Sequence, residues 1–97
     1  MPVVGFAGDG AFGIAVTELT AIGRKEWPAI TMVVFRNYQW GAEKRNSTLW
    51  YDDNFVGTEL DTQVSYANIA KACGLQGVVV HTMDELRDAL AKAIDDQ

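Results

Sequence analysis

The stretch Val3-Val4-Gly5-Phe6-Ala7-Gly8-Asp9-Gly10 is a continuous apolar run that ends in a glycine-rich turn. An uninterrupted apolar run of this length is typical of a strand buried on both faces of a parallel sheet. Where such a strand turns into a helix, free backbone N–H groups and the helix dipole favour an anion. Asp9 places a carboxylate there, where it would repel a bare phosphate. The sequence therefore predicts a divalent cation between Asp9 and a diphosphate.

A second apolar run, Ile30–Phe35, is followed directly by Arg36 and Asn37. The carboxyl ends of neighbouring parallel strands meet at one edge of a sheet, so we expect Asn37 to lie near Asp9. Mg²⁺ prefers an octahedral shell of oxygens, which the Asp9 carboxylate, the Asn37 amide, a backbone carbonyl of the next loop, diphosphate oxygens and water would complete. Calcium accepts the same ligands in a looser shell, so the preference for Mg²⁺ is a chemical inference.

Gly8, Gly10 and Gly13 also fit the G-x-G-x-x-G pattern of dinucleotide-binding units. That pattern expects an acidic residue at the end of the next strand to bind a ribose, whereas this chain has Arg36 there. Arg36 suits a 2′-phosphate, so an NAD(P)-binding module is an alternative interpretation. A third interpretation is an α/β interaction domain that binds no ligand.

The Gly8-Asp9-Gly10 motif, followed after residues 11–36 by Asn37, resembles the cofactor motif of the thiamine diphosphate-dependent enzymes. Within that family, the segment Phe35–Lys44 is similar to the corresponding part of the sulfoacetaldehyde acetyltransferases, and the similarity extends to the last predicted helix. The resemblance implies acetyl transfer with bond cleavage, in which sulfoacetaldehyde and phosphate give acetyl phosphate and sulfite. Acetolactate synthases and 2-oxo acid decarboxylases share the cofactor motif and are alternatives within the family.

The same resemblance implies a role for individual residues. Asp9 and Asn37 would ligate Mg²⁺ through their side chains, and Gln39 through its backbone carbonyl. Gly8, Gly10 and Ala11 would contact the diphosphate of the cofactor through main-chain atoms, and Trp40 and Gly41 would lie beside it. These cofactor-binding residues are Gly8, Gly10, Ala11, Gln39, Trp40 and Gly41.

No catalytic residue is expected in this chain, because family members take the glutamate that protonates the aminopyrimidine ring from a pyrimidine-binding domain, usually of a partner subunit. Their cofactor-binding domain also begins well before the Gly-Asp-Gly motif. We therefore expect residues 1–97 to be one domain, the C-terminal part of a pyrophosphate-binding domain in a longer enzyme, and inactive alone. Because removal of neighbouring strands and domains exposes strand edges, we also expect a homo-oligomer. In the full enzyme we expect a small-molecule substrate.

Composition indicates a single small folded domain with limited capacity for a core. The chain has 97 residues, of which 48% are hydrophobic, and a net charge of −5. That charge disfavours nucleic acids and anionic membranes as partners. No apolar run has the length of a membrane span, and the first residues lack the zones of a signal peptide, so we expect a cytoplasmic location.

The order of apolar patterns predicts an α/β fold with a three-layer arrangement and a mostly parallel sheet. Apolar residues at helical spacing predict a helix from Phe12 to Ile22, and another is expected around Ser65–Cys73. Thr82-Met83-Asp84-Glu85 is a capping box that predicts the start of a final amphipathic helix. Val78–Val80 is expected to be a short third strand, and Tyr38–Gln63 a long aromatic loop that covers either a sheet edge or the cofactor.

Three polar features have weaker functional interpretations. Cys73 is the only cysteine, so we expect it to pack as a small hydrophobe and not to form an intramolecular disulfide. His81 is also solitary, and no partner can be assigned to it for catalysis. Lys44-Arg45-Asn46 would attract an anionic substrate, although a solvated charged turn is the favoured interpretation.

Overall fold

A two-stranded parallel sheet forms the centre of the computed structural model, which describes residues 1–97. Strand β1 (Val4–Gly8) pairs with β2 (Thr31–Phe35) in a register that runs from Val4 opposite Thr31 to Gly8 opposite Phe35. Both strands predicted from the apolar runs are therefore confirmed. Because the pairing is parallel, Asp9 and Asn37 both follow strands that end at the same edge of the sheet.

The crossover between the strands is helical but broken into three pieces. These are α1 (Asp9–Ile14), the 3-10 turn η1 (Val16–Glu18) and α2 (Leu19–Ile22). The prediction of one helix from Phe12 to Ile22 was wrong, because the helix is interrupted at Ala15, whose φ is −109° and ψ 19°. Gly13 and the β-branched Val16 and Thr17 lower the helix propensity on both sides of the break.

Three further helices complete the chain: α3 (Gly41–Trp50), α4 (Tyr66–Ala72) and α5 (Met83–Asp95). The helix expected around Ser65–Cys73 is confirmed, and the Ser65 side chain caps it by accepting from Asn68 N–H at 3.2 Å. Thr82 Oγ1 likewise accepts from Glu85 N–H at 3.1 Å, as the capping box predicts. The Glu85 carboxylate reaches one residue further back than expected, to His81 N–H at 2.7 Å.

Two of the predicted elements were wrong. Tyr38–Gln63 is not all loop, because α3 lies within it; α3 is largely exposed and has no buried residue, so it lacks the apolar stripe that would have revealed it. Val78–Val80 does not form a third strand. A Cβ on Gly77 would overlap the backbone of Ala67 in α4, so the chain lies against α4 just before this segment, and the segment itself has no strand partner.

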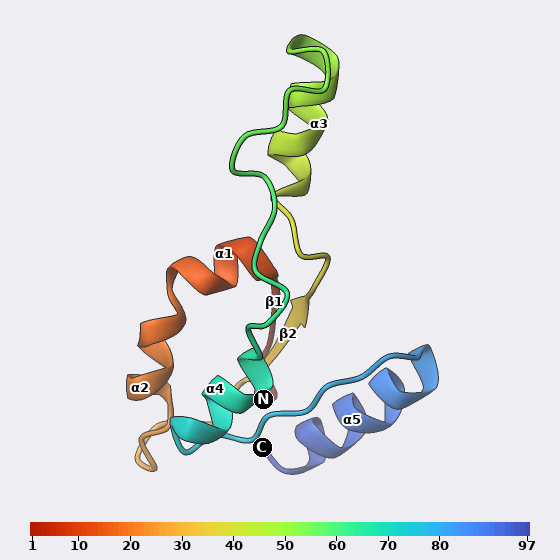
Figure 1. The fold of residues 1–97 in the computed structure, drawn as a ribbon. Helices are drawn as coiled ribbons and strands as arrows, with labels where there is room; N and C mark the ends of the chain where they lie inside the picture. The colour runs from red at the N-terminus through yellow and green to blue at the C-terminus, as the bar shows by residue number, and fades with distance from the viewer.

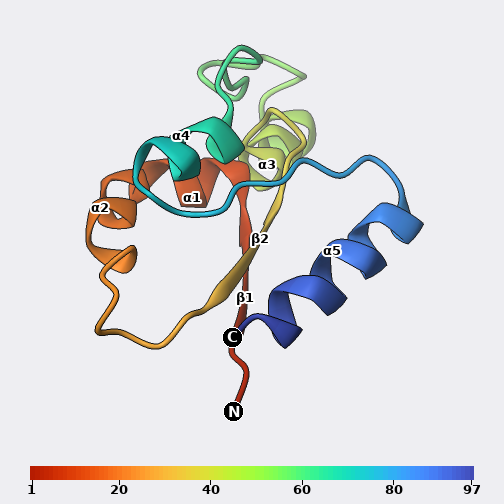
Figure 2. The same ribbon diagram turned by 90° about the horizontal axis from the view of Figure 1, so that it is seen from below.

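The helices lie on both sides of the sheet. In Figure 2, α1, α2 and α4 lie on one side of the strands and α5 on the other, which agrees with the expected three-layer α/β class. The Gln97 side chain fastens the end of α5 to the sheet, since its Oε1 accepts from Val3 N–H at 2.9 Å and its Nε2 donates to Thr31 Oγ1 at 2.6 Å. Helix α3 projects away from the other elements as an arm (Figure 1).

Few residues are shielded from solvent. Only 4 of 97 are buried, and Leu19 is the one large apolar side chain among them. The radius of gyration is 15.6 Å, larger than the ~12–13 Å expected for a closely packed chain of this length. The half-buried Cys73 is a free thiol. None of the helices is both long and apolar enough to cross a membrane.

Candidate functional site

The carboxylate of Asp9 is buried and held by the backbone from two directions. The residue is 3% exposed, Oδ1 accepts from Gly10 N–H at 3.0 Å, and Oδ2 accepts from Tyr38 N–H at 2.8 Å. Tyr38 has a φ of 60°, the left-handed conformation that non-glycine residues rarely adopt. The turn at Tyr38 thus brings the loop after β2 back to Asp9.

No cationic side chain neutralises this carboxylate. The ion pairs of the structure are Arg24–Glu26, Lys44–Glu59 and Arg87–Asp84. A buried charge without a counter-charge is costly, so the site favours a cation supplied from outside the chain. No cluster of three His, Cys, Asp or Glu side chains is present. A cation here would therefore rely on the Asp9 carboxylate together with neutral oxygens and oxygens of a bound ligand, a donor set that suits Mg²⁺.

Asp9 and Asn37 line the same cavity, which has a volume of about 690 Å³. The structure brings together in this cavity every metal-binding and cofactor-binding residue predicted from the sequence. The predicted residues on its wall are Gly8, Asp9, Gly10, Ala11, Asn37, Gln39, Trp40 and Gly41. Phe35, Arg36, Ala42 and Glu43 complete the wall, and Arg36 is its only basic residue.

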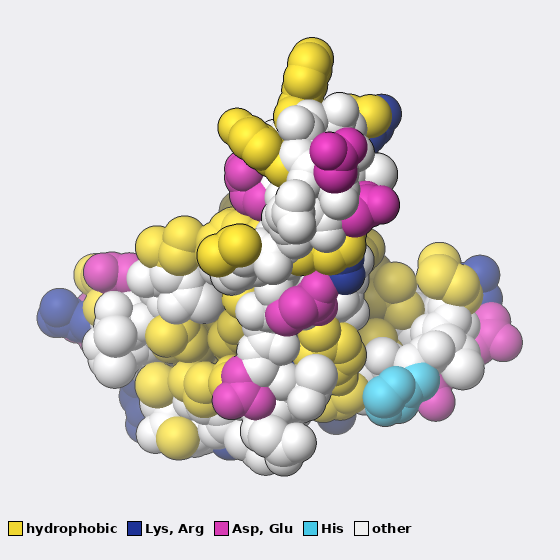
Figure 3. Space-filling view, turned by 45° about the horizontal axis from the view of Figure 1, so that its top comes forward, with side chains coloured by type: hydrophobic (Ala, Val, Ile, Leu, Met, Phe, Trp, Pro, Cys, Tyr) yellow, Lys and Arg dark blue, Asp and Glu magenta, His cyan; other side chains and the backbone are white.

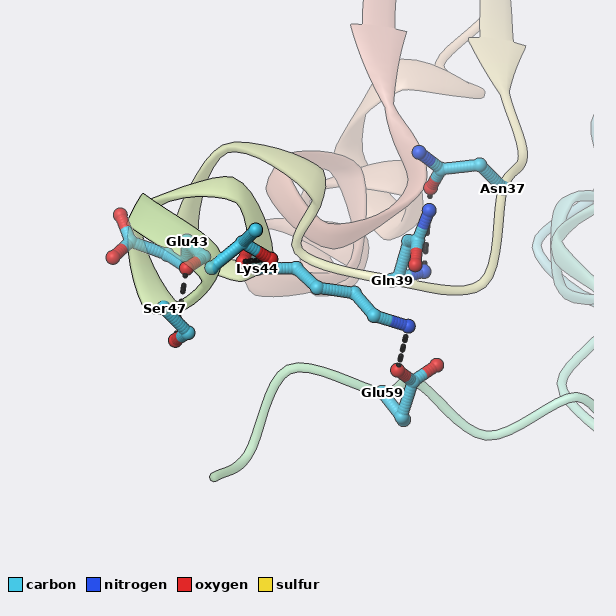
Figure 4. A network of polar contacts seen from close by, with 7 residues as sticks. Asn37, Gln39, Glu43, Lys44, Ser47 and Glu59 are labelled. Carbon is cyan, nitrogen blue, oxygen red and sulfur yellow. Dashed lines mark hydrogen bonds and ion pairs between the residues drawn. The ribbon is translucent and has the colours of Figure 1, made fainter. Parts of the chain in front are cut away.

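A single β-bridge between two backbone segments orients the loop that carries Asn37 and Gln39. Gln39 pairs with Glu59 in an isolated antiparallel bridge, and the hydrogen bonds are made by the flanking residues. These are Trp40 N–H to Thr58 O at 2.7 Å and Leu60 N–H to Tyr38 O at 2.8 Å. In such a pair both backbone groups of Gln39 point away from the Glu59 segment. Gln39 N–H accordingly donates to Asn37 Oδ1 at 3.2 Å (Figure 4). The bridge geometry directs the Gln39 carbonyl away from the Glu59 segment as well.

An ion pair connects the segment of this β-bridge that contains Glu59 to α3. Lys44 Nζ lies 2.5 Å from Glu59 Oε1 (Figure 4). The same nitrogen lies 5.1 Å from the centroid of the Phe55 ring. The Lys44-Arg45-Asn46 run is therefore part of a helix, which corrects the expectation of a charged turn, and Lys44 is already paired. An exposed ion pair of this kind contributes about 0–1 kcal/mol.

Gly8 and Gly10 have different surroundings, although both are glycines of the same Gly-Asp-Gly motif. A Cβ on Gly8 would meet no atom within 4 Å, whereas a Cβ on Gly10 would lie 2.9 Å from the Trp40 ring. Gly10 is buried, and its N–H is engaged by Asp9 Oδ1. The absence of a side chain at Gly10 therefore lets the Trp40 indole pack on the first turn of α1.

Two residues at the site were not found by the sequence analysis. The Tyr66 hydroxyl, from α4, donates to the backbone carbonyl of Asp9 at 3.1 Å. Thr58 is 4% exposed and its carbonyl accepts from Trp40, but its hydroxyl has no partner. Neither residue belongs to a motif, and both reach the site only through tertiary contacts. His81 and Cys73 do not line the cavity.

The whole chain, residues 1–97, matches the family model described as "Thiamine pyrophosphate enzyme, C-terminal TPP binding domain". It is 85% identical over 96 residues to a sulfoacetaldehyde acetyltransferase of Rhodobacter capsulatus, which covers 99% of this chain and 16% of that enzyme. It is 71% identical over 97 residues to a probable sulfoacetaldehyde acetyltransferase of Rhizobium meliloti, covering 100% of this chain and 16% of the relative. A probable acetolactate synthase of Mycobacterium bovis is 35% identical over 91 residues, with 94% and 16% covered. The chain thus spans 16% of the length of these relatives.

Proposed function

Since the chain belongs to the family of C-terminal thiamine pyrophosphate-binding domains of thiamine pyrophosphate enzymes, we propose that the Asp9 cavity holds Mg²⁺ and the diphosphate of that cofactor. Thiamine pyrophosphate is another name for thiamine diphosphate. The observation that carries the proposal is the buried Asp9 carboxylate, which lacks a cationic partner and shares its cavity with Asn37. A cation between Asp9 and the diphosphate would reduce the repulsion between the two negatively charged groups.

In this proposal Asp9 and Asn37 ligate Mg²⁺ by their side chains and Gln39 by its carbonyl. The Gln39 carbonyl is directed away from the Glu59 segment, which supports this role. The remaining cofactor contacts are assigned to Gly8, Gly10, Ala11, Trp40 and Gly41, which line the same cavity. The bound cofactor supplies a nucleophilic carbon for bond cleavage next to a carbonyl group.

We further propose that the chain is the C-terminal part of a longer enzyme that transfers an acetyl group from sulfoacetaldehyde to phosphate. The support is identity to sulfoacetaldehyde acetyltransferases of 85% and 71%, against 35% to an acetolactate synthase. The pyrimidine-binding domain, a partner subunit in a homo-oligomer and a cytoplasmic location are parts of the same proposal. An assay of the full-length enzyme for sulfite release, with acetolactate formation from pyruvate as the alternative, distinguishes the two activities.

The metal requirement is tested by calorimetry on the full-length enzyme with thiamine diphosphate, with and without Mg²⁺. We expect binding to require Mg²⁺. Asp9→Asn keeps the size of the side chain but removes its charge, and at short range in a buried site that charge contributes several kcal/mol. The variant should therefore weaken Mg²⁺-dependent binding about 100-fold or more.

Asp88→Asn is the matched control, because Asp88 is an exposed residue of α5 that makes no ion pair, and this variant should bind as the wild type does. Binding of thiamine diphosphate that is equally tight without Mg²⁺, or unchanged in Asp9→Asn, would contradict the proposed site.

A further inference from the structure

We propose that Tyr66 is a positioning residue for Asp9, and that position 13 is glycine because the Tyr66 hydroxyl occupies the space of a side chain there. The inference rests on the proposed function, since Asp9 is the residue assigned to the metal. Tyr66 is on α4, far from the motif in sequence, and touches neither the metal nor the cofactor in this proposal.

Tyr66 contacts the first helical turns of α1 at two places. Its hydroxyl donates to the backbone carbonyl of Asp9 at 3.1 Å. Its ring packs edge-on against Phe12, with centroids 5.3 Å apart and an interplanar angle of 85°. Ser65 caps α4 immediately before Tyr66, so the tyrosine projects from the fixed first turn of a helix.

Gly13 lies beneath the Tyr66 hydroxyl. A Cβ on Gly13 would lie 2.7 Å from the Tyr66 hydroxyl oxygen, but 3.7 Å and 3.9 Å from the nearest ring carbons. The first distance is a clash, whereas the other two are ordinary van der Waals contacts. An alanine at position 13 would therefore force the hydroxyl to move but would leave room for the ring.

These contacts define how Asp9 is held. Its carboxylate is bound by Gly10 N–H and Tyr38 N–H, and its carbonyl by the Tyr66 hydroxyl. Loss of the hydroxyl removes the contact to the backbone of Asp9 and leaves only the two contacts to its carboxylate, so the residue is held less rigidly before the cation arrives. The expected consequence is weaker Mg²⁺ binding, because a less organised ligand loses conformational entropy when it binds.

The experiment compares Tyr66→Phe, Gly13→Ala and the double variant in the full-length enzyme. Mg²⁺ affinity is measured by calorimetry with thiamine diphosphate present. Tyr66→Phe should raise the Kd for Mg²⁺ about 2- to 10-fold, the range for loss of one neutral hydrogen bond. Gly13→Ala should raise it at least as much, since the methyl group displaces the hydroxyl. The double variant should match Tyr66→Phe within about twofold, because the hydroxyl can be lost only once.

Thermal unfolding of the metal-free proteins provides a second measurement. Gly13→Ala should lower the midpoint, and adding Tyr66→Phe should restore it, because the methyl group then meets only the ring and alanine favours a helix over glycine. Tyr51→Phe is the matched control, since Tyr51 is 66% exposed and lies outside the Asp9 cavity. This control should change neither the affinity nor the midpoint.

Additive effects of Gly13→Ala and Tyr66→Phe on the Kd would overturn the inference, as would an unchanged Kd in Tyr66→Phe. A lowered midpoint with unchanged Kd would make Tyr66 merely structural and would also overturn it. If the wild-type enzyme bound thiamine diphosphate without Mg²⁺, the proposed function would fail and the inference with it. Wild-type Mg²⁺ dependence with additive variants would remove the inference alone.

Discussion

At the scale of the residue, Gly8 and Gly10 are both assigned to cofactor binding, but only Gly10 is closely packed against another side chain. Gly10→Ala would drive a Cβ into the Trp40 ring, whereas Gly8→Ala would meet no atom within 4 Å. Overpacking of this kind costs about 1–3 kcal/mol. We expect Gly10→Ala to lower the thermal midpoint of the metal-free full-length enzyme, and Gly8→Ala to leave it unchanged. Equal midpoints for both variants would show that Trp40 does not pack on Gly10.

At this scale, the expected placement of Asp9 and Asn37 near each other is confirmed, whereas their roles as ligands stay predictions. Asp9 and Asn37 each come directly after an apolar run, and parallel pairing carries both to one edge of the sheet. The family resemblance drawn from these residues is confirmed by the match over residues 1–97. Tyr66 and Thr58 were not predictable in the same way, because their contacts with the site depend on how separate elements pack.

At the scale of the element, the start of α5 depends on its cap. Thr82→Ala removes the acceptor for Glu85 N–H, and loss of such a cap costs about 1 kcal/mol. We expect amide hydrogens in the first turn of α5 to exchange about 5-fold faster in the full-length enzyme, measured by mass spectrometry. Thr82→Ser keeps the hydroxyl and should exchange like the wild type. Unchanged exchange in Thr82→Ala would mean that packing, and not the cap, holds this turn.

Among the elements, those with a strong local signal were predicted and those defined by their neighbours were not. The capping box at Thr82 predicted the start of α5, and the helix expected around Ser65–Cys73 is confirmed as α4. Val78–Val80 has the composition of a strand, but a strand needs a partner, and the sheet contains only β1 and β2. Helix α3, in contrast, is a real element without a recognisable sequence pattern, because its largely exposed residues show no apolar repeat at helical spacing.

At the scale of the whole molecule, the chain leaves large apolar surfaces uncovered. Phe6 and Phe35 stack with centroids 6.0 Å apart on one face of the sheet, yet they are 67% and 58% exposed. Leu49, Trp50 and Val56 are 61%, 76% and 88% exposed on and beside α3, and Figure 3 shows hydrophobic side chains projecting from the α3 lobe. Apolar composition predicted strands buried on both faces, and these 97 residues alone do not supply that burial.

This exposure leads to a prediction for residues 1–97 produced by themselves. A two-stranded sheet has two open edges, and exposed aromatic side chains favour association. We therefore expect the average molar mass measured by sedimentation to increase with protein concentration. Phe6→Lys should reduce the association, because it places a charge on the stacked face. Val79→Lys is the matched control, since Val79 is 58% exposed but lies outside the sheet, and it should associate as the wild type does. A wild-type chain that sediments as a monomer at every concentration would refute the link between the open sheet and association.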